Sequence, residues 1–327
     1  MVDAAQIGDT LITVTGIEPV VAAVSSPQAP PDGPTWRVEP SRLAPHVEHR
    51  VFADFPAFQG HLQRSLPQWS AQVQQALRLI ALNGIVDPIS GAAVPAEAIT
   101  ISGSNYRETL VHRGCLSRHR AVLLVLQELL AAGLLPPRQE LELYCPEAIT
   151  PFAALLRELF PNVLGSEYMP DPADPQRQRF PHQDLCELTL PQACVDLVLC
   201  NELFEHLYDL PAALAEIARI LRPGGWLVST FPFAYNRVDT IVKARHRPGA
   251  TPGVAAEAEL LMDPEFHGDP VHPEQGSLVY QIPAWDLLDQ ARLAGLSDPA
   301  IHWIAAPSYG VLGQELPAVM VLVAQRH

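Results

Sequence analysis

The chain has 327 residues, of which 48% are hydrophobic, enough for one large domain or for a catalytic domain with a smaller one. Its 36 acidic and 21 basic residues give a net charge of −15. We therefore expect it to bind neither nucleic acid nor an anionic membrane surface, since both require a positive field. The five cysteines contain no CxxC pair, so neither a zinc site nor a disulfide framework is expected, and reduced cysteines in a cytoplasm are predicted.

The N-terminal third is predicted to be organised separately from the rest. Residues 1–34 contain a β-prone run at 10–14 and a proline-rich linker, PQAPPDGP. Residues 35–100 are predicted to form a small, mainly helical module, with its clearest helix at 69–82. The first residues lack the basic region of a secretory signal, and no apolar run reaches the ~18 residues of a membrane span.

A basic cluster precedes a strongly apolar helix that is predicted at 118–133. It includes Arg107, Arg118 and Arg120, a concentration of positive charge that stands out in so acidic a chain. Two interpretations stay open. The cluster is either the solvated start of a helix or a contact for a carboxylate or phosphate group of a substrate.

Residues 139–233 alternate predicted strands and helices. In chain order they are a strand at 141–145, a helix from 151, strands at 163–167 and near 179–182, a strand at 195–200, a helix at 211–221 and a strand at 226–233. The strands at 195–200 and 226–233 are continuous apolar runs, as expected for strands covered on both faces. Such strand–helix–strand units cross over right-handed into a parallel sheet.

The C-terminal part completes the predicted sheet. An irregular insertion at about 234–282 is followed by a helix at 285–294 and by strands at 301–306 and 318–324, which we expect to pair antiparallel at the sheet edge. The predicted fold is therefore α/β and Rossmann-like: a doubly wound, mostly parallel seven-stranded sheet with an antiparallel edge strand, in a domain spanning 101–327.

Two short segments carry a family resemblance. Glu-His-Leu follows the fourth strand at 205–207, and Leu-Arg-Pro-Gly-Gly precedes the fifth at 221–225. In order and spacing they resemble the class I S-adenosylmethionine-dependent methyltransferases, well over 139–233 and loosely over 260–326. The resemblance implies methyl transfer with S-adenosylmethionine as cofactor. Two alternatives stay open: another doubly wound domain, or a methyltransferase-like binding module that has lost catalysis. A nicotinamide-dependent dehydrogenase is disfavoured, because no GxGxxG follows a first strand.

The resemblance also implies a cofactor site. Glu167 ends the second strand, where an acidic residue binds ribose hydroxyls, and Asp184 is expected near the adenine amino group. The loop after the first strand departs from the family pattern, because Tyr144, Pro146 and Ala148 stand where glycines are expected. The full set of implied cofactor residues is Glu142, Cys145, Glu147, Glu167, Tyr168, Asp184, Leu185, Asn201 and Glu202.

Histidines are the candidates for catalysis, since an oxygen acceptor needs a base and imidazole suits neutral pH. The candidates are His206, His267 and His272; the Glu205–His206 pair has a structural interpretation as well. The His-Gly-Asp-Pro turn at 267–270 resembles methyltransferases found alongside sugar and glycan biosynthesis enzymes. We therefore expect a small polar acceptor such as a sugar or glycan-linked molecule, with Arg107, Arg118 and Arg120 as substrate-binding residues, and we predict no metal ligand.

Overall fold

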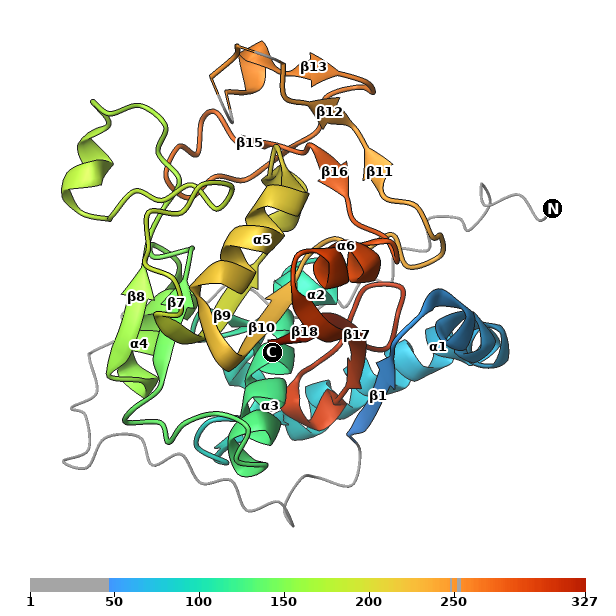
Figure 1. Ribbon diagram of the computed structural model, residues 1–327. Coiled ribbons are helices and arrows are strands. Elements are labelled where there is room, and N and C mark those ends of the chain that lie inside the picture. Colours follow the sequence, from blue (N-terminus) through green and yellow to red (C-terminus); the bar gives the residue numbers. More distant parts are fainter. Residues whose placement is uncertain (1–46, 248, 252–253) are drawn as a thin grey trace. The chain divides into compact units, whose positions relative to one another are not determined.

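The computed structural model describes residues 47–247, 249–251 and 254–327 (Figure 1). The β-prone run and the linker predicted within 1–34 lie outside the described residues. The described residues lie within one compact unit. Within the described part of the chain, no helix combines the length and the apolar character that crossing a membrane requires.

A mixed seven-stranded sheet lies at the centre of this unit. Its strands are, in spatial order, β1 (Glu48–Phe52), β17 (Leu296–Ala305), β18 (Val319–Arg326), β10 (Leu221–Thr230), β9 (Val195–Asn201), β7 (Glu142–Cys145) and β8 (Asn162–Gly165). The strands from β10 to β8 run parallel, whereas β18, β17 and β1 each pair antiparallel with their neighbour. The predicted α/β fold with a mainly parallel sheet is confirmed.

Two features of the sheet differ from the prediction. The antiparallel pair β17–β18 is present but does not form the edge, because β1 pairs with β17 from Glu48↔Ala305 to Phe52↔Ile301. The strand expected near 179–182 is reduced to a single parallel bridge between Glu167 and His182. Pro181, which has no N–H to donate, contributes only its carbonyl to this pairing.

Six helices lie in the described part of the chain, and three of them begin at a side-chain cap. They are α1 (Phe55–Asn83), α2 (Tyr106–Thr109), α3 (Ser117–Ala131), α4 (Pro151–Leu159), α5 (Leu210–Ile220) and α6 (Leu287–Leu293). The side chains of Asp54, Thr150 and Asp209 accept backbone N–H groups at the starts of α1, α4 and α5. Short 3₁₀ turns lie at η2 (Ala96–Ala98), η3 (Pro175–Gln178), η4 (Phe204–His206), η5 (Ala255–Glu257) and η6 (Pro307–Tyr309).

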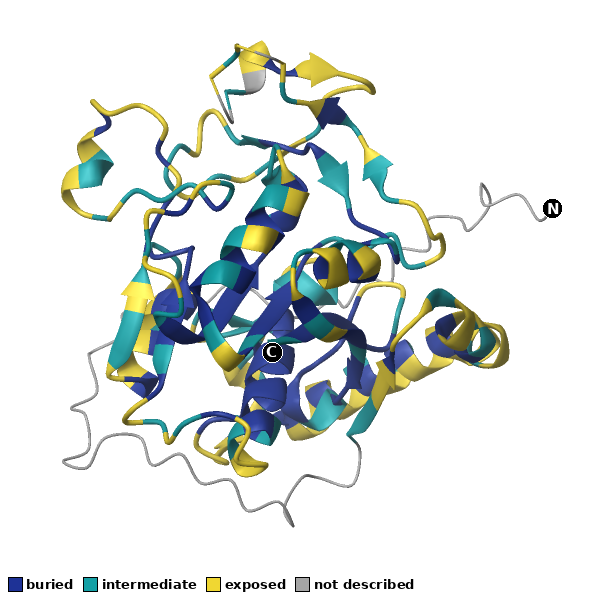
Figure 2. Ribbon diagram, viewed as in Figure 1, coloured by how far each residue is buried: buried dark blue, intermediate teal, exposed yellow. Residues whose placement is uncertain are grey.

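The sheet divides the core into two layers, as Figures 1 and 2 show. In β9, Val198 and Cys200 belong to the cluster that includes α5 and α6, whereas Leu197 and Leu199 belong to the cluster that includes α3 and α4. This alternation follows from the two-residue period of a strand. Every residue of β9 is buried, as expected for a strand covered on both faces.

The segment predicted as a separate N-terminal module packs against the main sheet. β1 is the edge strand, and Phe58 and Trp69 of α1 lie in the same core cluster as Trp285 and Trp303. The small strands that follow are β2 (Ile85–Val86), β3 (Ala93–Val94), β4 (Thr100–Ile101), β5 (Leu110–His112) and β6 (Cys115–Leu116). Because β4 pairs with β5, the boundary predicted near residue 100 falls within a small three-stranded sheet.

The Leu-Arg-Pro-Gly-Gly segment lies inside the fifth strand rather than before it. Helix α5 already ends at Ile220, and β10 begins at Leu221. The register between β9 and β10 shifts between Leu221 and Trp226, with Gly224 at φ 83°. The strand is therefore irregular at this point, and Gly224 supplies the left-handed backbone that the irregularity needs.

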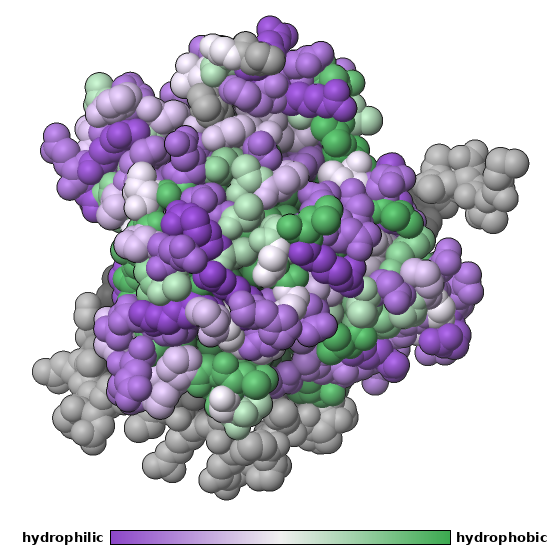
Figure 3. All heavy atoms as spheres, viewed as in Figure 1, coloured by the Kyte–Doolittle hydropathy of each residue, from purple (hydrophilic) through white to green (hydrophobic). Residues whose placement is uncertain are grey.

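The insertion at 234–282 forms three short antiparallel pairs. They are β11 (Ile241–Val242) with β16 (Gln281–Ile282), β12 (Ala244–Arg245) with β13 (Glu259–Leu260), and β14 (Phe266–His267) with β15 (Ser277–Leu278). The insertion is fixed to the segment after β9, because the N–H of Tyr280 donates to the carbonyl of Glu205 at 2.8 Å. On the face shown in Figure 3, hydrophobic residues form small separate groups among hydrophilic ones.

Candidate functional site

A pocket of about 700 Å³ lies beyond the carboxyl ends of β9 and β10. This is the edge of an open parallel sheet at which ligands bind. The pocket is lined by residues from the α2 region, the β9 and β10 ends, the insertion and the β17–β18 connection: Asn105, Arg107, Glu108, Arg118, Glu202, Glu205, His206, Phe231, Pro232, Phe233, Tyr235, His267, Gly268, Gly313, Gln314, Glu315, Leu316, Ala318 and Met320.

Two predicted arginines reach the pocket, and both are paired. Arg107 binds Glu202 through both of its terminal nitrogens, with Nη1 at 2.7 Å from Oε2, and it also contacts Glu108. Arg118 donates from Nε to both oxygens of Glu108, at 3.0 and 2.9 Å. The sequence analysis gave Glu108 no role. It joins the two arginines into one network.

Glu202 has a constrained backbone at the carboxyl end of β9. Its φ is 51°, and its N–H donates to the carbonyl of Thr230 at 2.7 Å. Burial would raise the pKa of the Glu202 carboxyl, but Arg107 and Arg118 lower it to about 2. Glu202 therefore carries a fixed negative charge that the arginines neutralise. This ion pair occupies its carboxylate, so Glu202 is not free to bind the cofactor.

Arg120 does not enter the pocket. Its buried guanidinium donates to three backbone carbonyls, those of Cys115 at 2.7 Å, Leu110 at 2.8 Å and Gly310 at 2.8 Å. The prediction that Arg120 binds substrate therefore has to be corrected. The three carbonyls belong to β6, β5 and the end of η6. Arg120 ties these segments together, because a guanidinium offers several donors in a fixed plane.

A second group of predicted residues lies around the loop after β7. Asn201 donates from Nδ2 to Glu147 Oε1 at 2.7 Å, and the Thr230 hydroxyl donates to the side-chain oxygen Oδ1 of Asn201 at 3.1 Å. Burial raises the pKa of Glu147 to about 7, against the opposing influence of Arg118 and Asn201. Cys145, at the end of β7, is fully buried.

The structure explains why this loop lacks glycines. The Tyr144 side chain is buried in the core on the α5 side, where its hydroxyl lies 2.7 Å from Ser166 Oγ, so it does not project into the loop. Close approach occurs instead at Gly165 of β8. A Cβ on Gly165 would lie 3.0 Å from Ala148 Cβ and 2.7 Å from Arg157 Nη2. The glycine that the packing requires is thus on the neighbouring strand.

The carboxylates of Glu167 and Asp184 each accept hydrogen bonds from neighbouring segments of the chain. Glu167 accepts the N–H of Ile149 at 2.7 Å, and burial raises its pKa to about 7. Asp184 accepts the N–H of Cys186 at 2.8 Å and the hydroxyl of Tyr208 at 2.7 Å. Each carboxylate oxygen can accept more than one hydrogen bond, so these contacts leave capacity for a ligand.

Three further residues implied by the resemblance are placed differently. Tyr168 is exposed with its ring 5.6 Å from that of His182, and Leu185 is buried in the core cluster on the α5 side. Glu142 begins β7, at the opposite end of the strand from Cys145. There its N–H donates to Asp196. The structure therefore does not bring Glu142 together with the other predicted cofactor residues.

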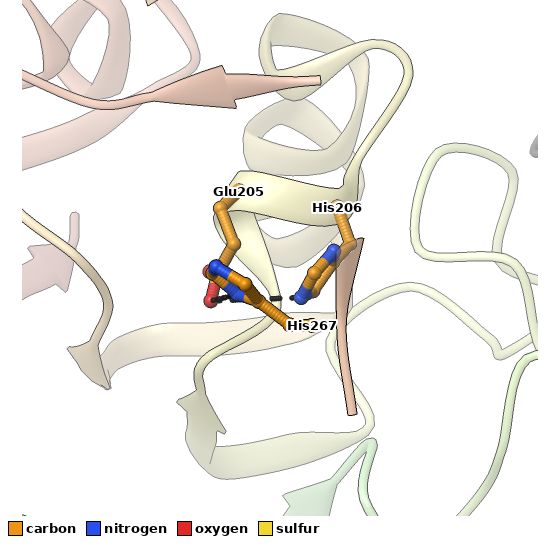
Figure 4. Close-up of side chains that lie close together, drawn as sticks. All are labelled: Glu205, His206 and His267. Atoms are coloured by element: carbon orange, nitrogen blue, oxygen red, sulfur yellow. Dashed lines mark ion pairs between the residues drawn. The ribbon is translucent and has the colours of Figure 1, made fainter. Parts of the chain in front are cut away.

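Two of the three predicted histidines meet at the pocket wall. His206 and His267 lie with their ring centroids 5.1 Å apart, beside the fully buried carboxylate of Glu205 (Figure 4). Burial raises the pKa of Glu205. His272 is not among the residues that line this pocket. It lies 2.8 Å from Asp174, in the segment that precedes η3.

The donor set around the β7 loop fits S-adenosylmethionine. Burial is the main cause that raises the pKa values of the Glu147 and Glu167 carboxyls. The negative charge of Glu147 raises the pKa of Glu167 further. A ligand with sulfonium and ammonium charges relieves this repulsion and supplies ribose hydroxyls as donors. Helix α4 begins beside them with Thr150 as its cap, so its amino end suits a ligand carboxylate.

Comparisons with known proteins agree with this fit. Residues 151–229 match the family model described as a methyltransferase domain. A probable S-adenosylmethionine-dependent methyltransferase of Mycolicibacterium smegmatis is 38% identical over 99 residues, which are 28% of this chain and 38% of the relative. The demethylmenaquinone methyltransferase of Deinococcus radiodurans is 38% identical over 88 residues, 24% of this chain and 36% of the relative. The matches thus span less than two fifths of either relative.

Solved structures also align. A methyltransferase from Mesorhizobium loti covers 64% of this chain and 98% of its own, with a TM-score of 0.39 and 17% identity. An N1-methyltransferase from Burkholderia thailandensis covers 64% of this chain and 78% of its own, with a TM-score of 0.34 and 16% identity. The family match thus identifies a methyltransferase domain within residues 151–229, and the matched segments resemble an S-adenosylmethionine-dependent methyltransferase and a demethylmenaquinone methyltransferase.

Proposed function

We propose that the chain transfers a methyl group from S-adenosylmethionine to an oxygen of a small polar acceptor in the pocket beyond β9 and β10. One observation carries the proposal: the pocket of about 700 Å³ has Glu205, His206 and His267 in its wall, and the first two lie a few residues along the chain from Asn201, the predicted cofactor residue at the end of β9. Its volume is in the range of small-molecule sites.

The cofactor supplies an electrophilic methyl carbon on a sulfonium centre. In the proposal, Glu167 accepts hydrogen bonds from its ribose hydroxyls, and Glu147 faces its ammonium group. Both carboxylates are fixed before the ligand arrives, Glu147 by Asn201 and Glu167 by the N–H of Ile149. Such preorganisation matters because methyl transfer depends mainly on the alignment of the nucleophile with the methyl carbon.

The pocket walls support a polar acceptor with an apolar face. Phe231, Phe233 and Met320 supply apolar surface, whereas Glu205, His206 and His267 supply groups that accept the proton of a hydroxyl. A sugar or a glycan-linked molecule combines the two properties. Because the charges of the arginines in the pocket are balanced by Glu108 and Glu202, a neutral acceptor suits it better than the anionic one suggested by the basic cluster.

Binding and transfer are tested separately. Calorimetry with S-adenosylmethionine and S-adenosylhomocysteine measures cofactor affinity, and methyl-labelled cofactor measures transfer to a panel of sugars, glycosides and phenols. We expect His267→Ala to lower kcat about 10²–10⁴-fold at unchanged cofactor affinity, the range for a proton-transfer group.

His272→Ala is the matched control, because His272 is bonded to Asp174 and does not line the pocket. It should retain the turnover of the unaltered chain. Cofactor binding without transfer to any acceptor would favour the binding-module alternative. Absence of cofactor binding, or equal turnover in both variants, would contradict the proposal.

A further inference from the structure

Three potential ligand atoms converge in the pocket wall. Glu205 and His206 lie on η4, directly after β9, and His267 comes from β14 in the insertion (Figure 4). Glu205 Oε1 is 3.6 Å from His206 Nε2 and 3.6 Å from His267 Nδ1. All three atoms lie within 4.8 Å of one another. The cluster therefore surrounds one point from three sides.

Glu205 is the unusual member of the cluster. Its side chain is 0% exposed, and neither carboxylate oxygen has a hydrogen-bond partner among the described residues. A separation of 3.6 Å is too long for a hydrogen bond to either imidazole. Since buried carboxylates are normally paired, hydrogen-bonded or bound to a metal, the geometry calls for a cation between these side chains.

The two imidazoles are oriented as metal ligands. His206 Nδ1 lies 2.9 Å from the carbonyl oxygen of Leu278, which can only accept a hydrogen bond. His267 Nε2 lies 3.1 Å from Glu265 Oε1, and Glu265 is itself paired with Lys243. Each ring thus donates its proton outward, and in the neutral imidazole the other nitrogen directs a lone pair toward Glu205. Outer carbonyls and carboxylates orient metal-bound histidines in the same way.

We propose that Glu205, His206 and His267 bind one divalent transition-metal ion, with an open coordination position facing the pocket. Two histidines and one carboxylate form open zinc and iron(II) sites in proteins. Ligands at about 2.0–2.1 Å from a tetrahedral ion are about 3.3–3.4 Å apart, so the two 3.6 Å separations need only a small closure.

The metal site extends the proposed function. Its role in catalysis rests on the proposed methyl transfer. With the ion bound, His206 and His267 act as its ligands rather than as bases. An acceptor hydroxyl at the open position would then lose its proton to water more readily, because a bound cation lowers the pKa of a coordinated oxygen. Binding of the ion itself depends on neither the cofactor nor the acceptor. It can therefore be tested without them.

The experiment uses the full chain without added affinity histidines, freed of metal by chelator dialysis. Zn²⁺ is titrated by calorimetry, and Co²⁺ is followed by its visible absorption, whose intensity reports coordination number. We expect one equivalent to bind and to raise the midpoint of thermal unfolding. His267→Ala and His206→Ala should each weaken binding more than about 100-fold, and Glu265→Gln by about 10–100-fold, the range for an outer partner.

Two controls separate a ligand role from loss of folding. Glu205→Gln keeps the size of the side chain, so its midpoint without metal should be retained or raised while metal binding is lost. His272→Ala should bind as the unaltered chain does. Absence of stoichiometric binding by the unaltered chain, or unchanged binding in His267→Ala, would overturn the metal site. Both results leave the methyl-transfer proposal standing, since that is judged by cofactor binding and transfer.

Discussion

Arg107 and Glu202, which are 95 positions apart in the sequence, form a bidentate ion pair in the lining of the pocket. The pair connects the α2 region to the carboxyl end of β9, where Glu202 has a φ of 51°. Such a backbone conformation costs free energy in a residue other than glycine, and the surrounding contacts must hold it. The pair therefore stabilises both the fold and the shape of the pocket.

Removal of one partner of this pair should destabilise the protein. We expect Arg107→Ala to lower the free energy of unfolding by about 3 kcal/mol, because it leaves the Glu202 carboxylate buried without its main counter-charge. The double variant Arg107→Met, Glu202→Gln should recover part of the loss. Chemical denaturation of the three proteins measures the effect, and equal stability of the single and double variants would show that the charge is unimportant.

The same pair predicts acid sensitivity. The pKa of Glu202 is lowered to about 2 in the folded state, so its contribution to stability is present above the ordinary pKa near 4.5 and is lost as the pH falls toward 2. In Glu202→Gln this component is absent, and the free energy of unfolding should fall less steeply over that window. Parallel pH profiles for the two proteins would contradict the assignment.

Cofactor affinity should rise with pH up to about 7. Burial raises the pKa values of Glu147 and Glu167 to about 7, and a cationic ligand prefers the ionised carboxylates, so binding releases protons. Below pH 7 we expect about a tenfold gain in affinity per pH unit for each proton released. Without ligand the sign reverses: the free energy of unfolding falls as the pH rises from about 4.5 to 7.

Calorimetry in buffers of different ionisation enthalpy counts the released protons. Glu147→Gln should remove at least part of the pH dependence, whereas Glu158→Gln, at an exposed position on α4, should leave it unchanged. A flat affinity between pH 5 and 7 in the unaltered protein would contradict the expected proton release.

Gly165→Ala should disturb the cofactor loop. The added methyl group would meet Ala148 and Arg157 at distances below ordinary contact. We expect a loss of about 1–3 kcal/mol in stability, the usual range for overpacking, together with weaker cofactor binding. Gly60→Ala within α1 is the control, because its new Cβ has room and alanine favours a helix. The control should be slightly stabilised, as measured by thermal unfolding.

Arg120→Met should lower the stability of the protein and leave the binding of the acceptor unchanged. The substitution leaves three buried carbonyls without their donor, and we expect a loss of about 3 kcal/mol. Below the unfolding range, KM for the acceptor should stay unchanged. Arg113→Gln, at an exposed position, should alter neither quantity. A raised KM in a stable Arg120→Met protein would restore the substrate-binding interpretation.

The sequence predicted best where its patterns were local and strong. β9, α5 and the start of α4 at Thr150 follow from apolar periodicity and from capping residues, which act over a few positions. The pairing of β1 with β17 could not be read in this way, because it joins positions about 250 residues apart with no shared motif. The expected third strand failed because Pro181 and its neighbours cannot support a regular ladder.

The site was predictable only in part for the same reason. The sequence identified His206 and His267 as candidates, but not that Glu205 would stand between them without a hydrogen bond. Nor could spacing show that Arg107 and Arg118 are neutralised by Glu202 and Glu108. Which charged side chains face one another in a pocket depends on the folded structure, and the sequence patterns alone do not determine it.

The β14–β15 hairpin has a consequence for how such a protein can diversify. One of its strands carries His267, and the other supplies the Leu278 carbonyl that orients His206. Exchanging this hairpin between relatives would therefore carry over His267 together with the carbonyl that orients His206. Any change in this hairpin therefore acts on both imidazoles of the pocket wall at once, on one directly and on the other through its hydrogen bond.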